Sequence, residues 1–285
     1  MVVGGDAFQN RLAGGGGEVE DVPARVGGFS PENLEAGAAG IALEQPFSGG
    51  NVEVISYSPS GVLTSAQYLG IVGKPFTSYT VDYENGEPAS ASFSNGMTGI
   101  YALNADGSYD IAFQNLPANW GFSTFEGVHN AAGVCVARAE DMTNGSGDLP
   151  LYANGLTVSS SSGHLSVTTG ADTFPLNAHA TEAISATGLN SETFEYASGF
   201  GHSSITGLLA GGGASDVIEL HLSMFSGLSS TNTAAQNLAD LLSSGAAAQS
   251  GPNVTITDSA HDVLTLMGVT TSTLNAYANS VFKFV

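Results

Sequence analysis

Short apolar groups recur every nine or ten residues between residues 156 and 220. They are Leu156–Val158, Leu165–Val167, Phe174–Leu176, Ile184, Phe194–Tyr196, Ile205 and Val217–Leu220. Gly, Ser, Thr, Asn and Asp fill most of the intervening positions. A βαβ domain needs helical patterns of about 10–15 residues between its strands, and this segment contains none. The spacing therefore predicts a parallel β-roll or β-solenoid, in which each short strand forms half of a turn.

The charge of the chain limits its partners. It contains 26 acidic and 5 basic residues, for a formal net charge of -21, although only 11% of its residues are charged. Nucleic acid and anionic membrane surfaces are poor partners for such a chain, because both attract clustered positive charge. Carboxylates without basic neighbours repel one another and suit a divalent cation. The alternative is that the charge serves solubility alone.

The targeting signals are sparse. Cys135 is the only cysteine, so no intrachain disulfide is expected. The first residues contain neither the basic nor the apolar region of a signal peptide, and no apolar run is long enough to span a membrane. Three interpretations remain: a cytoplasmic protein, a fragment of a longer one, or export by a route that recognises the C-terminus. We expect the third, with the protein extracellular or on the cell surface and no N-terminal signal peptide.

Three segments follow from the patterning. Residues 1–50 are Gly-rich and are expected to form a linker or an assembly arm. Residues 51–155 contain alternating strands separated by turns such as Asn85-Gly86 and Asn95-Gly96, which predicts an antiparallel hairpin meander. Residues 156–285 contain the predicted roll. The fold class expected is thus all-β, with a meander followed by a parallel roll and a capping helix.

The capping helix is expected just after residue 231. Thr231 to Thr233 supply capping side chains, and Leu238 and Leu241 recur at helical spacing. Such a helix would cover the open end of the roll, where the last turn otherwise exposes its core. The alternative is a helix that binds a partner.

Two parts of the chain resemble known families. The sequence VDYENGEPASASFSNGM, with YALNADGSYDI after it, resembles the tyrosine–aspartate hairpin repeats of bacterial surface proteins. Residues 170–228 and 251–285 resemble the C-terminal region of repeat-in-toxin (RTX) proteins, which bind calcium and leave the cell by type I secretion. The matching features are Gly170-x-Asp172-x-Phe174, Gly199-Phe200-Gly201-His202, Asp216-Val217-Ile218, Val254-x-Ile256 and Asp262-x-Leu264.

The RTX resemblance implies a β-roll that binds Ca²⁺ through Asp172, Asp216, Asp258 and Asp262. The chain departs from that family because it contains no complete glycine-rich nonapeptide. Ser203, Glu192 and Glu219 also stand where aspartates would be expected. A roll that has lost its metal sites therefore remains the alternative.

Catalytic motifs are nearly absent. The chain contains no nucleophile elbow, zinc-protease motif, P-loop or dinucleotide fingerprint, and the His179/Glu182 pair is a weak signal by itself. We expect a secreted, non-enzymatic structural or adhesion protein, stabilised by calcium. The alternative is an extracellular glycan-binding or glycan-degrading protein, since β-solenoids also carry such sites.

The expected partners are other copies of the chain, in a homo-oligomer or filament, or other surface and matrix components, with glycans as a further option. Apolar groups at Val19–Val22, Phe29 and Ile41–Leu43 stand in the Gly-rich segment, which buries little surface by itself. We therefore expect the first 50 residues or so to order against a neighbouring copy.

Overall fold

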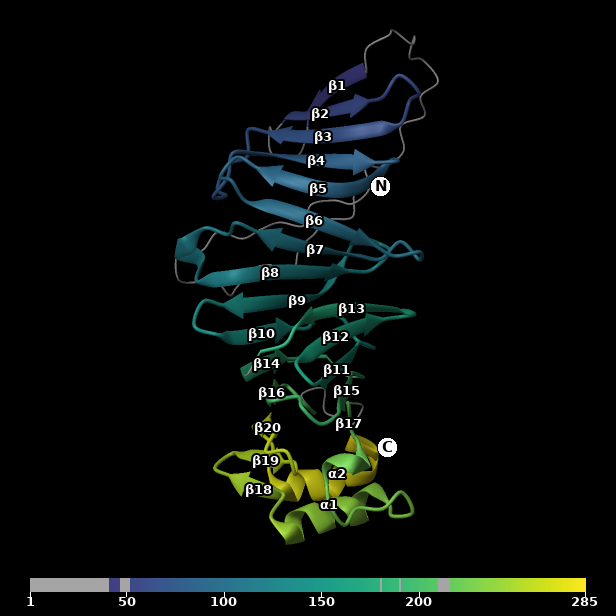
Figure 1. Ribbon diagram of the computed structural model, residues 1–285, viewed down its shortest axis with the longest axis vertical. Helices are drawn as coiled ribbons and strands as arrows, with labels where there is room; N and C mark the ends of the chain where they lie inside the picture. The colour runs from purple at the N-terminus through teal and green to yellow at the C-terminus, as the bar shows by residue number, and fades with distance from the viewer. Residues whose placement is uncertain (1–40, 47–51, 180, 190, 210–215) are drawn as a thin grey trace. The chain divides into compact units, whose positions relative to one another are not determined.

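The computed structural model describes residues 41–46, 52–179, 181–189, 191–209 and 216–285. These residues form mainly β-strands in large sheets (Figure 1), which confirms the expected all-β class. The chain divides into two compact units. The first contains the residues up to Phe125 and Ala131–Gly133, and the second contains Glu126–Asn130 and Val134–Val285.

The first unit is built on one antiparallel sheet in which successive strands are neighbours. Its strands are β1 (Ile41–Pro46), β2 (Val52–Tyr57), β3 (Leu63–Leu69), β4 (Ser78–Glu84), β5 (Glu87–Phe93), β6 (Thr98–Leu103) and β7 (Tyr109–Gln114), followed by the 3-10 helix η2 (Ala118–Trp120). Strand β8 (Phe122–His129) begins in this unit and ends in the second. Aromatic side chains on one face pack in sequence from strand to strand, as with Tyr68 on Tyr79 and Tyr79 on Phe93.

The second unit begins with β9 (Cys135–Met142), β10 (Ser146–Pro150), β11 (Thr157–Ser161), β12 (His164–Thr169), β13 (Asp172–Asn177), β14 (Thr181–Ser185), β15 (Thr193–Tyr196), β16 (His202–Thr206) and β17 (Val217–Leu220). It continues with η3 (Leu222–Met224), α1 (Ala234–Ser244), β18 (Ala247–Ser250), β19 (Asn253–Thr257), β20 (Val263–Met267), α2 (Thr271–Val281) and β21 (Phe282–Phe284).

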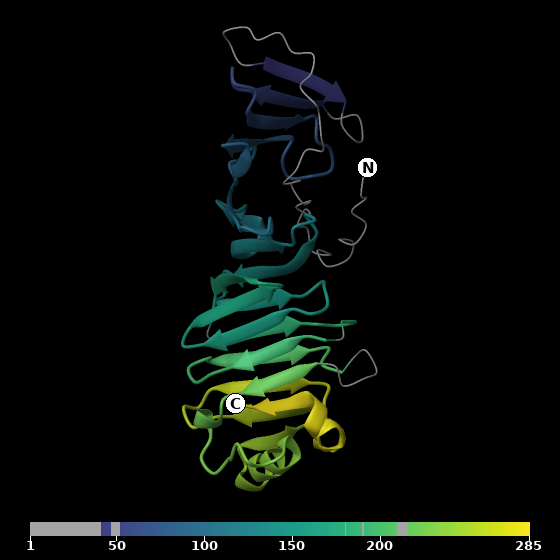
Figure 2. The same ribbon diagram turned by 90° about the vertical axis from the view of Figure 1, so that its right-hand side faces the viewer.

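Two sets of parallel strands form the centre of the second unit (Figures 1 and 2). Strands β10, β14, β16 and β20 pair in parallel in one sheet. Strands β11, β15, β17 and β21 do so in the other. From β14 to β17 the chain alternates between the two sheets at each strand.

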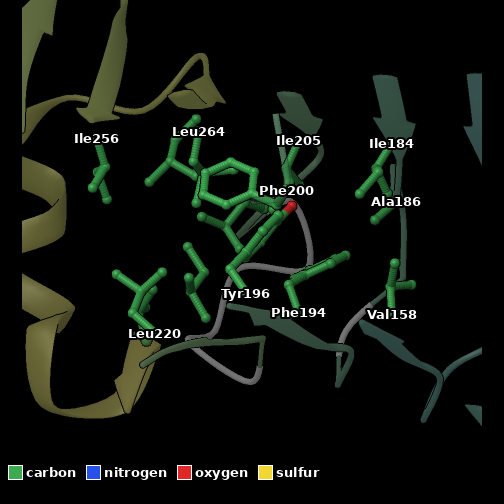
Figure 3. Packing of buried hydrophobic residues seen from close by; sticks show 14 of the residues in the cluster. Val158, Ile184, Ala186, Phe194, Tyr196, Phe200, Ile205, Leu220, Ile256 and Leu264 are labelled. Atoms are coloured by element: carbon green, nitrogen blue, oxygen red, sulfur yellow. The ribbon is translucent and has the colours of Figure 1, made fainter. Parts of the chain in front are cut away.

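Equivalent side chains on these strands stack in register and fill the space between the sheets. Leu149, Ile184, Ile205 and Leu266 are aligned in one sheet, and Val158, Phe194, Ile218 and Phe282 in the other. All eight are buried, and Figure 3 shows several facing one another across the core. This pattern explains the apolar spacing of the sequence, because each strand contributes one or two inward side chains per pass.

The expectation of one strand per half-turn is wrong for β12 and β13. Both pair antiparallel, β12 with β11 and β13 with β12. Ser162 and Gly163, with φ of 46° and 78°, form the tight connection between β11 and β12. A two-residue connection can join only antiparallel neighbours, whereas parallel neighbours need a long crossover.

The expected helix is present as α1. The Thr233 side chain accepts a hydrogen bond from the Gln236 backbone N–H, and the Gln236 side chain accepts one from Thr233 in return. Leu238 and Leu241 are buried, and the helix lies against α2, β18 and β21. The sequence did not predict α2, whose cap is Thr270.

Most of the proposed assembly arm lies outside the described residues, including Val19–Val22 and Phe29. Ile41–Leu43 belong to β1, which pairs along the whole of β2 in the same chain. This part of the segment therefore occupies the free edge of its own sheet.

Candidate functional site

A cluster of acidic side chains surrounds Gly147 on three adjacent strands of the second unit. Asp141 on β9 lies opposite Gly147 on β10, and Gly147 lies opposite Glu182 on β14. Because Gly147 has no side chain, the Glu182 carboxyl and the His179 ring both lie over its backbone. A Cβ atom at position 147 would overlap Glu182 Oε2 and would lie 2.6 Å from His179 Cδ2.

The segment between β13 and β14 holds the Asp141 carboxylate. Asn177 Nδ2 donates a hydrogen bond of 3.3 Å to Asp141 Oδ2, and His179 Nε2 contacts Asp141 Oδ1. The Asp141 side chain is 8% exposed and that of His179 is 19% exposed, so the imidazole lies nearest to solvent. Burial makes this polar contact between distant parts of the chain stronger than it would be at the surface.

Glu182 is the unusual member of this cluster. The residue is 5% exposed, and its Oε2 atom has no hydrogen-bond partner. Burial raises the pKa of Glu182 to about 8, and the charges of Asp141 and Asp148 add to the rise. At neutral pH this carboxyl therefore carries a proton, which it could donate as a general acid.

Asp216 lies inside the second unit and accepts hydrogen bonds from the backbone. Its Oδ1 accepts from the N–H groups of Ser191 and Glu192, at 3.0 and 3.3 Å. Its Oδ2 accepts from the N–H of Leu209, at 3.1 Å. The residue is 1% exposed, so these bonds compensate for the loss of water.

Asp262 and Asp258 also bind backbone N–H groups. Asp262 accepts from Gly199 and Gly201, at 2.6 and 3.1 Å, and so joins the turn before β16 to the start of β20. Asp258 Oδ1 accepts from Ala260 and Asp262, whereas its buried Oδ2 has no partner. Burial raises the pKa of Asp258.

The structure does not gather the four predicted metal ligands into one set. Asp172 is half-buried at the start of β13. Throughout the described ranges, no group of three or more His, Cys, Asp or Glu side chains is arranged to hold a metal ion. Several backbone N–H groups converge on the Asp216 carboxylate and on the Asp262 carboxylate. The hydrogens of these groups carry partial positive charge, so the arrangement suits a carboxylate better than it suits a cation.

One buried carboxyl has no donors on either oxygen. Glu192 is fully buried, neither of its carboxylate oxygens has a hydrogen-bond partner, and it lies just before β15, beside Asp216 just before β17. Burial and the nearby Asp216 raise the pKa of Glu192. Two carboxyls so close are not both charged unless a cation lies with them, so either Glu192 holds a proton or a cation shares its two free oxygens.

Sequence reasoning named Glu182 only in a weak pair with His179 and Glu192 only as a replacement for an aspartate, and it did not name Asp141. Strand alternation could have revealed two of them, because Glu182 precedes buried Ile184 by two residues and Glu192 precedes buried Phe194 in the same way. Side chains two residues apart on a strand point to the same face. The contact of Asp141 with His179 had no comparable signal.

Among the described residues no helix is both long and apolar enough to cross a membrane. Comparison of the chain with protein-family models gives no match. Comparison with curated protein sequences gives no significant match either.

Proposed function

We propose that this chain is a secreted, non-enzymatic structural or adhesion protein whose second unit is an RTX-like parallel β-roll. The observation that carries the proposal is the alternation of the chain between two sheets of parallel strands, with one inward ladder of apolar residues in each. The hairpin strands of the first unit fit an extracellular β module, as in the surface proteins that its sequence resembles.

Calcium is part of this proposal, and Glu192 with Asp216 is its most suitable position. Glu192 would supply free carboxylate oxygens in the interior, beside the Asp216 carboxylate that backbone N–H groups hold, and a bound cation would remove the repulsion between the two. Calcium would then stabilise the folded unit, because the unfolded chain does not bring the two carboxyls together.

Export can be tested with the whole chain in a bacterial host that contains a type I exporter. We expect full-length protein in the medium when the exporter is active, and retention in the cells when its ATPase is inactivated. Equal amounts of the protein in the medium under both conditions would argue against type I export. Retention of the protein in the cells under both conditions would also argue against it.

Assembly can be tested by removing only residues 1–40. This deletion retains β1, whose pairing with β2 covers the edge of the first sheet. We propose that residues 1–40 link copies of the chain, or link it to matrix components or glycans. Light scattering should then give a larger mass for the full chain than for the truncated one, and equal monomeric masses would contradict this role.

A glycan-acting protein is the second candidate, favoured by the grouping of Asp141, His179 and Glu182 around Gly147. A protonated carboxyl beside an ionised one is the combination that glycoside hydrolysis uses. Release of new sugar ends from a panel of acidic and neutral polysaccharides would support it, provided that Glu182→Gln abolishes the release. No release by the unaltered chain would remove this candidate.

A further inference from the structure

Glu182 occupies an inward position in the second unit without an ionic partner of its own. It lies in register with Gly147 on one side and with Ser203 on the other, in the face that carries Ile184 into the core. Its Oε2 atom has no donor, although most buried carboxylates have at least one. An ionised Glu182 would therefore lose its hydration without compensation.

The groups around Glu182 do not offset a negative charge there. Asp141 faces it from β9 and Asp148 from β10, and both would repel it. His179, the nearest basic group, already contacts Asp141. Tyr196 faces it from β15 as a neutral phenol: burial raises the pKa of Tyr196, and Glu182 adds to that rise. Apart from His179, which is engaged with Asp141, these groups thus favour the neutral form of Glu182.

We infer that Glu182 is a proton-binding site that stabilises the β9–β10–β14 part of the second unit in acidic media, and that this contribution is lost as the pH rises through neutral to mildly alkaline values. The inference does not depend on calcium, secretion or catalysis. It requires only the buried position of the carboxyl and the absence of a donor for Oε2.

The sign of the pH effect follows from the raised pKa. In the unfolded chain Glu182 loses its proton near the ordinary value of 4.5, whereas in the folded unit it keeps the proton up to about 8. The contribution of Glu182 to stability is therefore complete below pH 4.5 and is lost as the pH rises towards 8. The difference of 3.5 between these values corresponds to at most about three-thousandfold in the unfolding equilibrium constant.

Glu182→Gln tests the inference, because glutamine has nearly the same shape and cannot ionise. Denaturant unfolding of the whole chain is measured between pH 5 and pH 9, with Glu195→Gln as the control. Glu195 is a half-buried acid on β15 that accepts a hydrogen bond of 2.7 Å from Ser159. We expect the unaltered chain and the control to lose stability between these pH values, and Glu182→Gln to lose less, the remaining loss being that of Glu192, whose pKa is also raised. The same pH dependence in all three proteins would overturn the inference.

Two measurements on the unaltered chain remain decisive if Glu182→Gln does not fold. Near pH 6.5, unfolding should release about one proton from this site, because the folded form holds it and the unfolded form does not. Hydrogen exchange of residues 146–150 and 181–185 should accelerate between pH 5 and pH 8 by more than the general base-catalysed increase seen in β18 and β19. Absence of both effects would contradict the inference.

Discussion

The hydroxyl oxygens of Tyr196 and Ser203 lie 3.0 Å apart in the core of the second unit. Tyr196 belongs to β15 in one sheet and Ser203 to β16 in the other, so this hydrogen bond joins the two sheets through the interior. Tyr196 is 1% exposed and Ser203 is 4% exposed. Each hydroxyl therefore satisfies the other where water does not reach.

Tyr196→Phe should destabilise the second unit by about 1–3 kcal/mol, because it leaves the buried Ser203 hydroxyl without a partner. The double variant Tyr196→Phe/Ser203→Ala should lose less than the sum of the two single variants. Denaturant unfolding measures all four free energies of the cycle. Strict additivity would mean that this hydrogen bond contributes nothing.

Gly147→Ala should cost about 1–3 kcal/mol, since the new Cβ would overlap Glu182 and crowd the His179 ring. The loss should be smaller when the same change is made together with Glu182→Ala, because the carboxyl is then absent. Thermal unfolding of the four proteins provides the comparison. An equal cost in both backgrounds would show that Glu182 does not occupy the space over Gly147.

Asp262→Ala should cost about 2–4 kcal/mol, because the N–H groups of Gly199 and Gly201 would lose a charged acceptor. Asp240→Ala is the matched control in the same unit. Its exposed carboxylate accepts one hydrogen bond of 3.3 Å from Asn232, and its loss should change stability by about 0.5 kcal/mol or less. Similar losses in the two variants would argue that Asp262 does not hold the turn before β16.

The sequence predicted the positions of the strands in the second unit better than their pairing. The alternation of apolar and polar residues predicts that side chains such as Phe174 and Phe194 point inward. It does so whether the strand follows a hairpin or a long crossover, and it therefore does not reveal the pairing. Only the short Ser162-Gly163 connection distinguishes the antiparallel β11–β12 pair from the parallel β11–β15 pair. Helix α1 was predictable because its cap and its apolar stripe are both local.

The partners of the acidic residues were less predictable. An aspartate after a glycine-rich turn suits a metal ion or a set of backbone N–H groups, and the residue type alone does not decide between them. In the structure Asp216 and Asp262 receive N–H groups from segments distant in sequence. The meeting of Asp141 with His179 likewise depends on the path of the β10–β14 crossover, which no local pattern encodes.

The central proposal is that the second unit is a roll stabilised by calcium beside Glu192 and Asp216. The most direct measurement is the thermal midpoint of the whole chain in EDTA and in millimolar Ca²⁺, with Glu192→Gln beside it and Mg²⁺ as the ionic control. At a calcium concentration of about 100 times the dissociation constant, the folded state should gain about 2.7 kcal/mol, and the midpoint should rise accordingly. Glu192→Gln should show little rise. A midpoint of the unaltered chain that is the same in EDTA and in Ca²⁺ would contradict the claim.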